Sequence, residues 1–126
     1  AAKLARPERE VLAIVGDGCF QMMAGEMATA RRLGLRVLFV VLNDGDLALI
    51  RVKQERKGLE VYGVDLGTGG ERAPVEPPPH YFGVPCVAVR SPEELRQAVR
   101  GAFGADGPTV IEAIVDGREY SETVYD

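Results

Sequence analysis

The sequence lacks tryptophan and contains one histidine, His80, and two cysteines, Cys19 and Cys86. A single histidine excludes a zinc site built on several histidines. A Ser-His or Cys-His catalytic pair would therefore have to use His80. His80 follows three prolines, and this position favours a surface loop. Two cysteines form no disulfide framework, so we expect a reducing, cytoplasmic environment.

The chain also lacks long apolar runs and an excess of positive charge. No apolar run reaches the length that crosses a membrane, and the charged opening AAKLARPERE does not resemble a signal peptide. The formal net charge of −4 gives no indication of a nucleic-acid surface. With 126 residues, 46% hydrophobic and 27% charged, the chain has the composition of one globular domain over residues 1–126. We therefore expect neither nucleic-acid nor membrane partners.

The residues that are present predict a strand, a helix and a second strand near the start of the chain. Val11–Val15 is a short apolar run typical of a buried strand, and Arg36–Leu42 is a second one, rich in β-branched residues. A helix is expected between them from Cys19 to Leu33, ended by Gly34. Its predicted buried side chains are Phe20, Met22, Met23, Met27 and Ala30.

The rest of the chain continues this alternation and indicates an α/β domain. Asp46–Arg56 is predicted to be a helix whose solvated side includes Arg51, and residues 63–82 form a glycine- and proline-rich irregular loop. The later elements are a strand at Cys86–Val89, a helix that starts with Ser91 as its N-cap and runs to Phe103, and a strand at Thr109–Val115.

Two oxygen-bearing side chains stand where the first two strands end. Asp17 lies between Gly16 and Gly18, and Asn43 opens the turn Asn43-Asp44-Gly45. In a right-handed βαβ unit both breaks fall at the carboxyl edge of a parallel sheet, where open α/β sheets bind ligands. Carboxylate and amide oxygens suit Mg²⁺, and the start of the following helix suits a phosphate. The pattern predicts a site for Mg²⁺ and a diphosphate.

The segments GDGCFQM and LND, with the spacer between them, resemble the thiamine-diphosphate motif of enzymes that depend on this cofactor. The flanks AKLARPER, LIRVKQERKG, SPEELRQAV and GPTVIEAIVD are similar to the acetolactate synthase/pyruvate decarboxylase branch, over nearly the whole chain. This resemblance implies a doubly wound, mostly parallel sheet with helices on both faces. It also implies the cofactors thiamine diphosphate and Mg²⁺.

The resemblance further assigns residues to the cofactor. The implied metal ligands are the side chains of Asp17 and Asn43 and the main-chain carbonyl of Gly45. The wider set of cofactor-binding residues is Gly16, Asp17, Gly18, Cys19, Asn43, Gly45 and Leu47. For Cys19, phosphate binding and packing as a small apolar residue both stay open. The Leu47 element is either a cover for the cofactor or an ordinary amphipathic helix.

No catalytic residue is assigned to this chain. In the family, the glutamate that activates the aminopyrimidine lies on a separate pyrimidine-binding domain or subunit, so this chain by itself is expected to be inactive. The implied partners are that domain, further copies in a homo-oligomer, and a 2-keto acid substrate. Two alternatives stay open: a non-catalytic module for Mg²⁺–diphosphate compounds or for assembly, and a nucleotide-binding domain. The second is ranked last because no GxGxxG follows the first strand.

Overall fold

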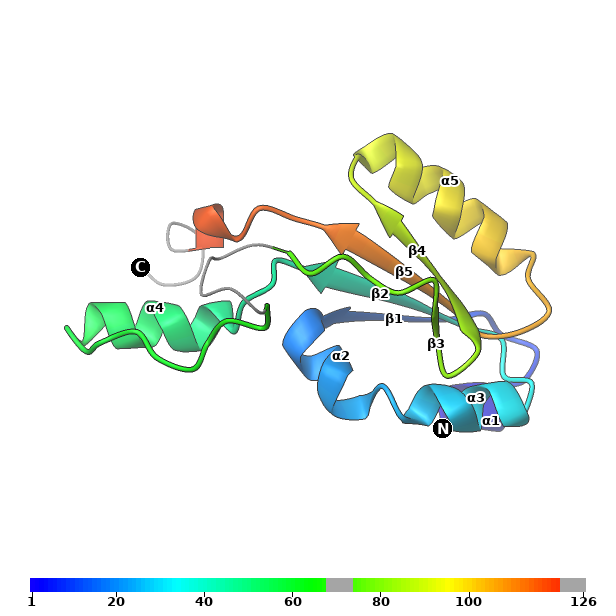
Figure 1. Ribbon diagram of the computed structural model, residues 1–126. Coiled ribbons are helices and arrows are strands. Elements are labelled where there is room, and N and C mark those ends of the chain that lie inside the picture. The colour runs from blue at the N-terminus through cyan, green and yellow to red at the C-terminus, as the bar shows by residue number, and fades with distance from the viewer. Residues whose placement is uncertain (68–73, 121–126) are drawn as a thin grey trace.

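The computed structural model describes residues 1–67 and 74–120, which form one mostly parallel sheet with helices on both faces (Figure 1). The elements in chain order are α1 (Ala2–Ala5), β1 (Val11–Gly16), α2 (Asp17–Met23), α3 (Glu26–Arg32), β2 (Val37–Asn43), α4 (Ala48–Arg56), β3 (His80–Tyr81), β4 (Val84–Val89), α5 (Pro92–Phe103), β5 (Thr109–Ile114) and the 3-10 helix η1 (Gly117–Glu119).

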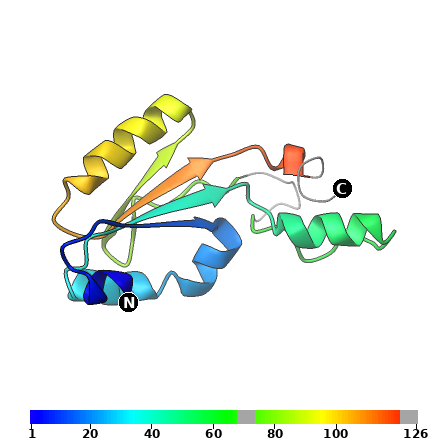
Figure 2. The ribbon, with the colours of Figure 1, turned by 180° about the vertical axis from the view of Figure 1, so that it is seen from behind.

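The order of the strands explains why helices cover both faces. The sheet runs β1-β2-β5-β4-β3, with the first four strands parallel and β3 antiparallel to β4. The crossover from β1 to β2 and the crossover from β4 to β5 travel across the sheet in opposite directions. Because such crossovers are right-handed, α2 and α3 lie on one face and α5 on the other, as the two ribbon views agree (Figures 1 and 2). The predicted doubly wound, mostly parallel architecture is confirmed.

Two apolar cores lie on the two faces of the sheet. On the α2 side, Phe20 and Met27 pack against strand residues that include Val41 and Val110. On the α5 side, Leu38 and Ile111 pack against the helix side chains Leu95, Ala98, Val99 and Ala102. Alternate residues of one strand serve opposite faces, which is why neighbouring apolar residues such as Val110 and Ile111 are both fully buried.

The predicted helix Cys19–Leu33 is wrong as a single element. It is interrupted at Ala24 and Gly25, whose carbonyls accept from the N–H groups of Met27 and Ala28 in tight i+3 bonds. The break turns Met22 and Met23 to the surface, at 83% and 39% exposed, so their assignment to the core is also wrong. Gly34 ends α3 with φ +59°, as the sequence predicts for a C′ glycine.

The segment predicted as an irregular loop, residues 63–82, contains more order than expected. Asp65 forms an antiparallel bridge with Asp46, and His80–Tyr81 is β3, paired with β4. His80 is exposed as predicted, but it lies in this short strand and not in a loop. Residues 68–73, the middle of the predicted loop, lie outside the described residues. The prolines that precede β3 exclude a helix at this point.

The helix α4 lies apart from the rest of the helices. It projects beyond the carboxyl ends of the strands in both ribbon views, with the chain after it running back along its side (Figures 1 and 2).

Among the described residues, no helix combines the length and the apolar character that crossing a bilayer requires.

Candidate functional site

Asp17 occupies the turn from β1 into α2 and is only 7% exposed. Its Oδ1 accepts from the N–H of Gly18 at 2.8 Å, and its Oδ2 accepts from the N–H of Gly45 at 2.8 Å. Burial raises the pKa of Asp17, backbone hydrogen bonds from Gly45, Gly18 and Asp44 oppose this rise, and the negative charge of Glu112 adds to it. No lysine or arginine of the described ranges forms an ion pair with this carboxylate. A cation bound here would offset the cost of burying it.

Asn43 ends β2 and is 3% exposed. Its Nδ2 donates to the carbonyl of Val75 at 2.8 Å and to Oε2 of Glu112 at 2.7 Å. Its Oδ1 has no hydrogen-bond partner, and it is the only buried side-chain oxygen or nitrogen in residues 1–67 and 74–120 of which this is true. An unpartnered buried polar atom is costly, and in a native protein it calls for an explanation such as a bound ion or water.

The structure brings these two side chains to one cavity. Asp17 and Asn43 both line a small cavity of about 50 Å³ under the proline-rich segment 75–78. The described part of the chain holds no cluster of three or more His, Cys, Asp or Glu side chains arranged for a metal. Two oxygen ligands with further oxygens from a main-chain carbonyl, a phosphate or water are therefore the set available here. That set fits Mg²⁺, which keeps several non-protein ligands.

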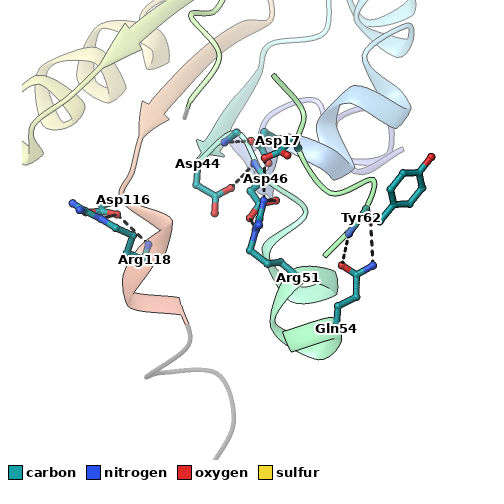
Figure 3. A network of polar contacts seen from close by, with 10 residues as sticks. Asp17, Asp44, Asp46, Arg51, Gln54, Tyr62, Asp116 and Arg118 are labelled. Carbon is teal, nitrogen blue, oxygen red and sulfur yellow. Dashed lines mark hydrogen bonds and ion pairs between the residues drawn. The ribbon is translucent and has the colours of Figure 1, made fainter. Parts of the chain in front are cut away.

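The turn that carries Gly45 is fixed from both sides. Leu66 N–H donates to the Gly45 carbonyl at 2.9 Å, and Leu47 N–H donates to Val64 at 2.8 Å. Figure 3 shows the carboxylates of Asp17, Asp44 and Asp46 gathered around this turn. Asp44 accepts from the N–H of Asp46 at 3.2 Å, which is consistent with its predicted role in the turn. A carbonyl oxygen has two lone pairs, so the Gly45 carbonyl keeps one after bonding Leu66.

Arg51 connects α4 to this turn. Its guanidinium reaches Asp46 at 2.5 Å and Asp65 at 3.0 Å, and its side chain is 15% exposed (Figure 3). The prediction that Arg51 lies on the solvated side of its helix is therefore wrong. Asp46 is only five positions before Arg51, but Asp65 is fourteen positions after it. The return of the segment 62–66 along α4 brings Asp65 to the arginine.

Gly18 lies against the side chain of Leu47. A Cβ added at Gly18 would lie 2.5 Å from Cδ2 of Leu47, so the two residues are in close contact. Gly16 has open space where a Cβ would be. Cys19 is exposed, so the alternative in which it packs as a small apolar residue is wrong. The predicted contacts of Gly16, Gly18, Cys19, Gly45 and Leu47 with the cofactor stay predictions.

Two residues of the site were not predicted from the sequence, Glu112 and Tyr81. Glu112 stands in the middle of β5, is 3% exposed, and accepts from Asn43 Nδ2 and from the Tyr81 hydroxyl. Burial and the bond to Glu112 raise the pKa of Tyr81. The available signal was a glutamate inside the β-branched run TVIEAI, where an acidic side chain has to be buried.

The environment of the two thiols predicts different reactivities. Burial, with a contribution from the charge of Glu112, raises the pKa of Cys86 to about 12, whereas Cys19 is exposed. Because the thiolate is the reactive form, we expect a disulfide reagent at pH 8 to modify the exposed Cys19 rapidly and Cys86 much more slowly. Stopped-flow absorbance on Cys19→Ser and Cys86→Ser separates the two rates. Equal rates would contradict the burial of Cys86.

The sequence profile of the family "Thiamine pyrophosphate enzyme, C-terminal TPP binding domain" matches residues 1–113. The chain belongs to this family of thiamine-diphosphate-binding domains. Within the family it falls in the acetolactate synthase/pyruvate decarboxylase-like branch, as its resemblance in sequence predicts.

Individual relatives agree with this placement. The chain is 31% identical over 118 residues to the catabolic acetolactate synthase of Raoultella terrigena, which covers 94% of this chain and 20% of that protein. It is 30% identical over 123 residues to an acetolactate synthase of Bacillus subtilis, covering 98% and 20%. The chain thus spans about a fifth of the length of the curated relatives it matches.

A solved structure shows the same fold. It is the thiamine diphosphate-dependent 4-hydroxybenzoylformate decarboxylase of Rhodococcus jostii RHA1, with a TM-score of 0.79 and 28% identity. The match covers 91% of this chain and 21% of that one.

Proposed function

We propose that this domain binds the diphosphate of thiamine diphosphate through Mg²⁺ held by the side chains of Asp17 and Asn43. The observation that carries the proposal is the unpartnered Oδ1 of Asn43 in the same cavity as the buried carboxylate of Asp17. Both are hard oxygen ligands of the kind Mg²⁺ prefers. The main-chain carbonyl of Gly45, which is held next to Asp17 by its own N–H, is the proposed third protein ligand.

The residues of this chain bind and orient the cofactor. Asp17 and Asn43 hold the ion, and the N–H of Gly18 donates to Asp17 and so positions its carboxylate. The N–H of Cys19 and the side chain of Leu47, which lies against Gly18, are proposed to face the cofactor. When bound, thiamine diphosphate supplies the carbanion chemistry by which 2-keto acids lose CO₂. None of the side chains at the site is proposed as an acid or a base of that reaction.

The activity we propose is that of an acetolactate-synthase-like carboligase or a 2-keto acid decarboxylase, completed by a pyrimidine-binding domain or subunit. Two relatives about five times as long as this chain are acetolactate synthases, and we propose that this chain contributes one part of such a site. A homo-oligomer and a 2-keto acid substrate are the proposed partners. The two free cysteines support a reducing, cytoplasmic location.

Calorimetry tests the proposed binding. Thiamine diphosphate is titrated into the intact protein, in the assembly in which it is isolated, with MgCl₂ and with EDTA. We expect saturable binding with MgCl₂ and its loss with EDTA, because a diphosphate next to a buried carboxylate needs a cation between them. Absence of binding in both conditions contradicts the proposal.

An activity assay distinguishes an enzyme from a domain that only binds the cofactor. Pyruvate consumption is measured with and without an added chain that carries the pyrimidine-binding domain. Turnover that requires the added chain supports the enzyme, whereas cofactor binding without turnover in the complete assembly supports a non-catalytic Mg²⁺–diphosphate-binding module.

A further inference from the structure

The carboxamide of Asn43 is held in one of its two orientations. Nδ2 donates to two acceptors, Oε2 of Glu112 at 2.7 Å and the carbonyl of Val75 at 2.8 Å. A rotation of the amide by half a turn would bring Oδ1 against both of these acceptors and lose both bonds. Because Asn43 is 3% exposed, water offers little replacement. The orientation that leaves Oδ1 without a partner is therefore the favoured one.

Glu112 is placed by the sheet to impose this orientation. It pairs with Val41 in the register between β5 and β2, and Asn43 follows Val41 by two positions, so Glu112 and Asn43 share one face of the sheet. Its other carboxylate oxygen accepts from the hydroxyl of Tyr81, whose ring packs edge-on against Phe20 at 4.9 Å between centroids. The carboxylate is thus fixed on both sides, by a strand and by a packed aromatic side chain.

Charge gives a second reason for a carboxylate at this position. Within residues 1–67 and 74–120, no lysine or arginine forms an ion pair with Glu112, which is 3% exposed. A buried carboxylate without a counter-ion is costly, and an apolar residue would fill this strand position more cheaply. Glu112 and Asp17 both line the small cavity that Asn43 also lines. A divalent cation between them would be attracted by both charges.

We propose that Glu112 is a positioning residue for the ion site: it holds the Asn43 amide with Oδ1 available to a divalent cation and adds a second buried negative charge next to it. This inference rests on the proposed binding of Mg²⁺ and thiamine diphosphate. Glu112 touches neither in this role and acts only through Asn43 and through its charge. Partners of metal ligands commonly contribute about 10–100-fold to metal affinity.

Nuclear magnetic resonance reads the orientation directly, without a variant. Asn43 is the only asparagine of the 126-residue sequence, so ¹⁵N labelling of asparagine side chains gives one NH₂ pair. We expect both protons to be hydrogen-bonded and slow to exchange with solvent, in the apo protein and after addition of Mg²⁺ and thiamine diphosphate. Protons that exchange as fast as those of free asparagine, in either state, overturn the proposal.

Variants then measure the effect on the ion, by calorimetric titration of Mg²⁺ at saturating thiamine diphosphate. Glu112→Met removes the acceptor at similar volume, and we expect Mg²⁺ affinity to fall about 10–100-fold. Glu112→Gln keeps an acceptor for Asn43 and removes the charge, so it should keep the protected NH₂ pair and lose less affinity than Glu112→Met. Asp106→Asn is the control, because it removes the charge of an exposed carboxylate in the loop between α5 and β5, at the opposite end of the strands, and should leave Mg²⁺ affinity unchanged.

The outcomes separate this proposal from the one on which it rests. Failure of the unsubstituted protein to bind Mg²⁺ and thiamine diphosphate contradicts the proposed function. Normal binding by the unsubstituted protein together with unchanged Mg²⁺ affinity in a folded Glu112→Met variant contradicts the role of Glu112 alone. If Glu112→Met does not fold, the proposal is tested by the exchange rates of the Asn43 amide protons in the unsubstituted protein and in Glu112→Gln. Fast exchange in the unsubstituted protein overturns the role of Glu112.

Discussion

Replacing Asp17 by alanine is expected to abolish Mg²⁺-dependent binding of thiamine diphosphate, with a loss in affinity greater than about 100-fold, because a metal ligand should cost more than the residues that support it. The substitution removes the charged member of the proposed ligand pair. It also frees the N–H groups of Gly18 and Gly45, which both donate to this carboxylate at 2.8 Å. Calorimetry with and without Mg²⁺ measures the loss.

Two further variants show whether the charge or the hydrogen bonds of Asp17 matter. Asp17→Asn keeps the size of the side chain and one acceptor, so the fold should persist while binding still weakens strongly. Asp106→Ala removes an exposed carboxylate from the loop between α5 and β5, at the opposite end of the strands, and should leave binding unchanged. Binding by Asp17→Ala that is equal to that of the Asp106→Ala control would contradict the assignment of the ligand.

Replacing Phe20 by alanine is expected to lower the free energy of unfolding by about 3–5 kcal/mol. Phe20 is 1% exposed, and its ring contacts Phe39 at 6.4 Å and Tyr81 at 4.9 Å between centroids. The loss combines apolar surface, a cavity in the core under α2, and an edge-to-face aromatic pair. Urea unfolding followed by circular dichroism measures it.

The same helix offers a control for this substitution. Met22 lies two residues further along α2 and is 83% exposed, so Met22→Ala should change the free energy of unfolding by less than about 0.5 kcal/mol. Phe20→Leu keeps most of the apolar volume and should fall between the two alanine variants. Similar losses for Phe20→Ala and Met22→Ala would mean that α2 does not pack on the sheet through Phe20.

The sequence was sufficient for the elements that local patterns determine. The apolar runs, Gly34 and the Ser91 N-cap, whose side chain accepts from the N–H of Glu94, predict strands and helix ends that the structure confirms. The meeting of Asp17 and Asn43 follows from the chirality of a βαβ unit, since both residues end neighbouring parallel strands. These features depend on short stretches of chain and on a general rule of handedness.

What the sequence could not give are contacts between distant segments. In the sequence, α2 and α3 look like one helix, because the apolar residues keep a helical spacing across the interruption at Ala24 and Gly25. The bond between Asn43 and Glu112 joins residues 69 positions apart, and nothing local to either of them predicts it. Arg51 likewise appears solvent-facing until Asp65 returns to it. In each case a tertiary contact decides what a local pattern leaves open.

The two edge strands of the sheet, β1 and β3, differ in how readily they could pair with a further strand. β3 is two residues long and follows three consecutive prolines, which have no N–H groups to donate to a further strand. β1 is six residues long, and its side chains Leu12 and Ile14 are 46% and 65% exposed. Growth of the sheet by another strand is therefore favoured along β1 and blocked along β3. A charged residue in place of Ile14 would therefore oppose the pairing of a further strand along β1.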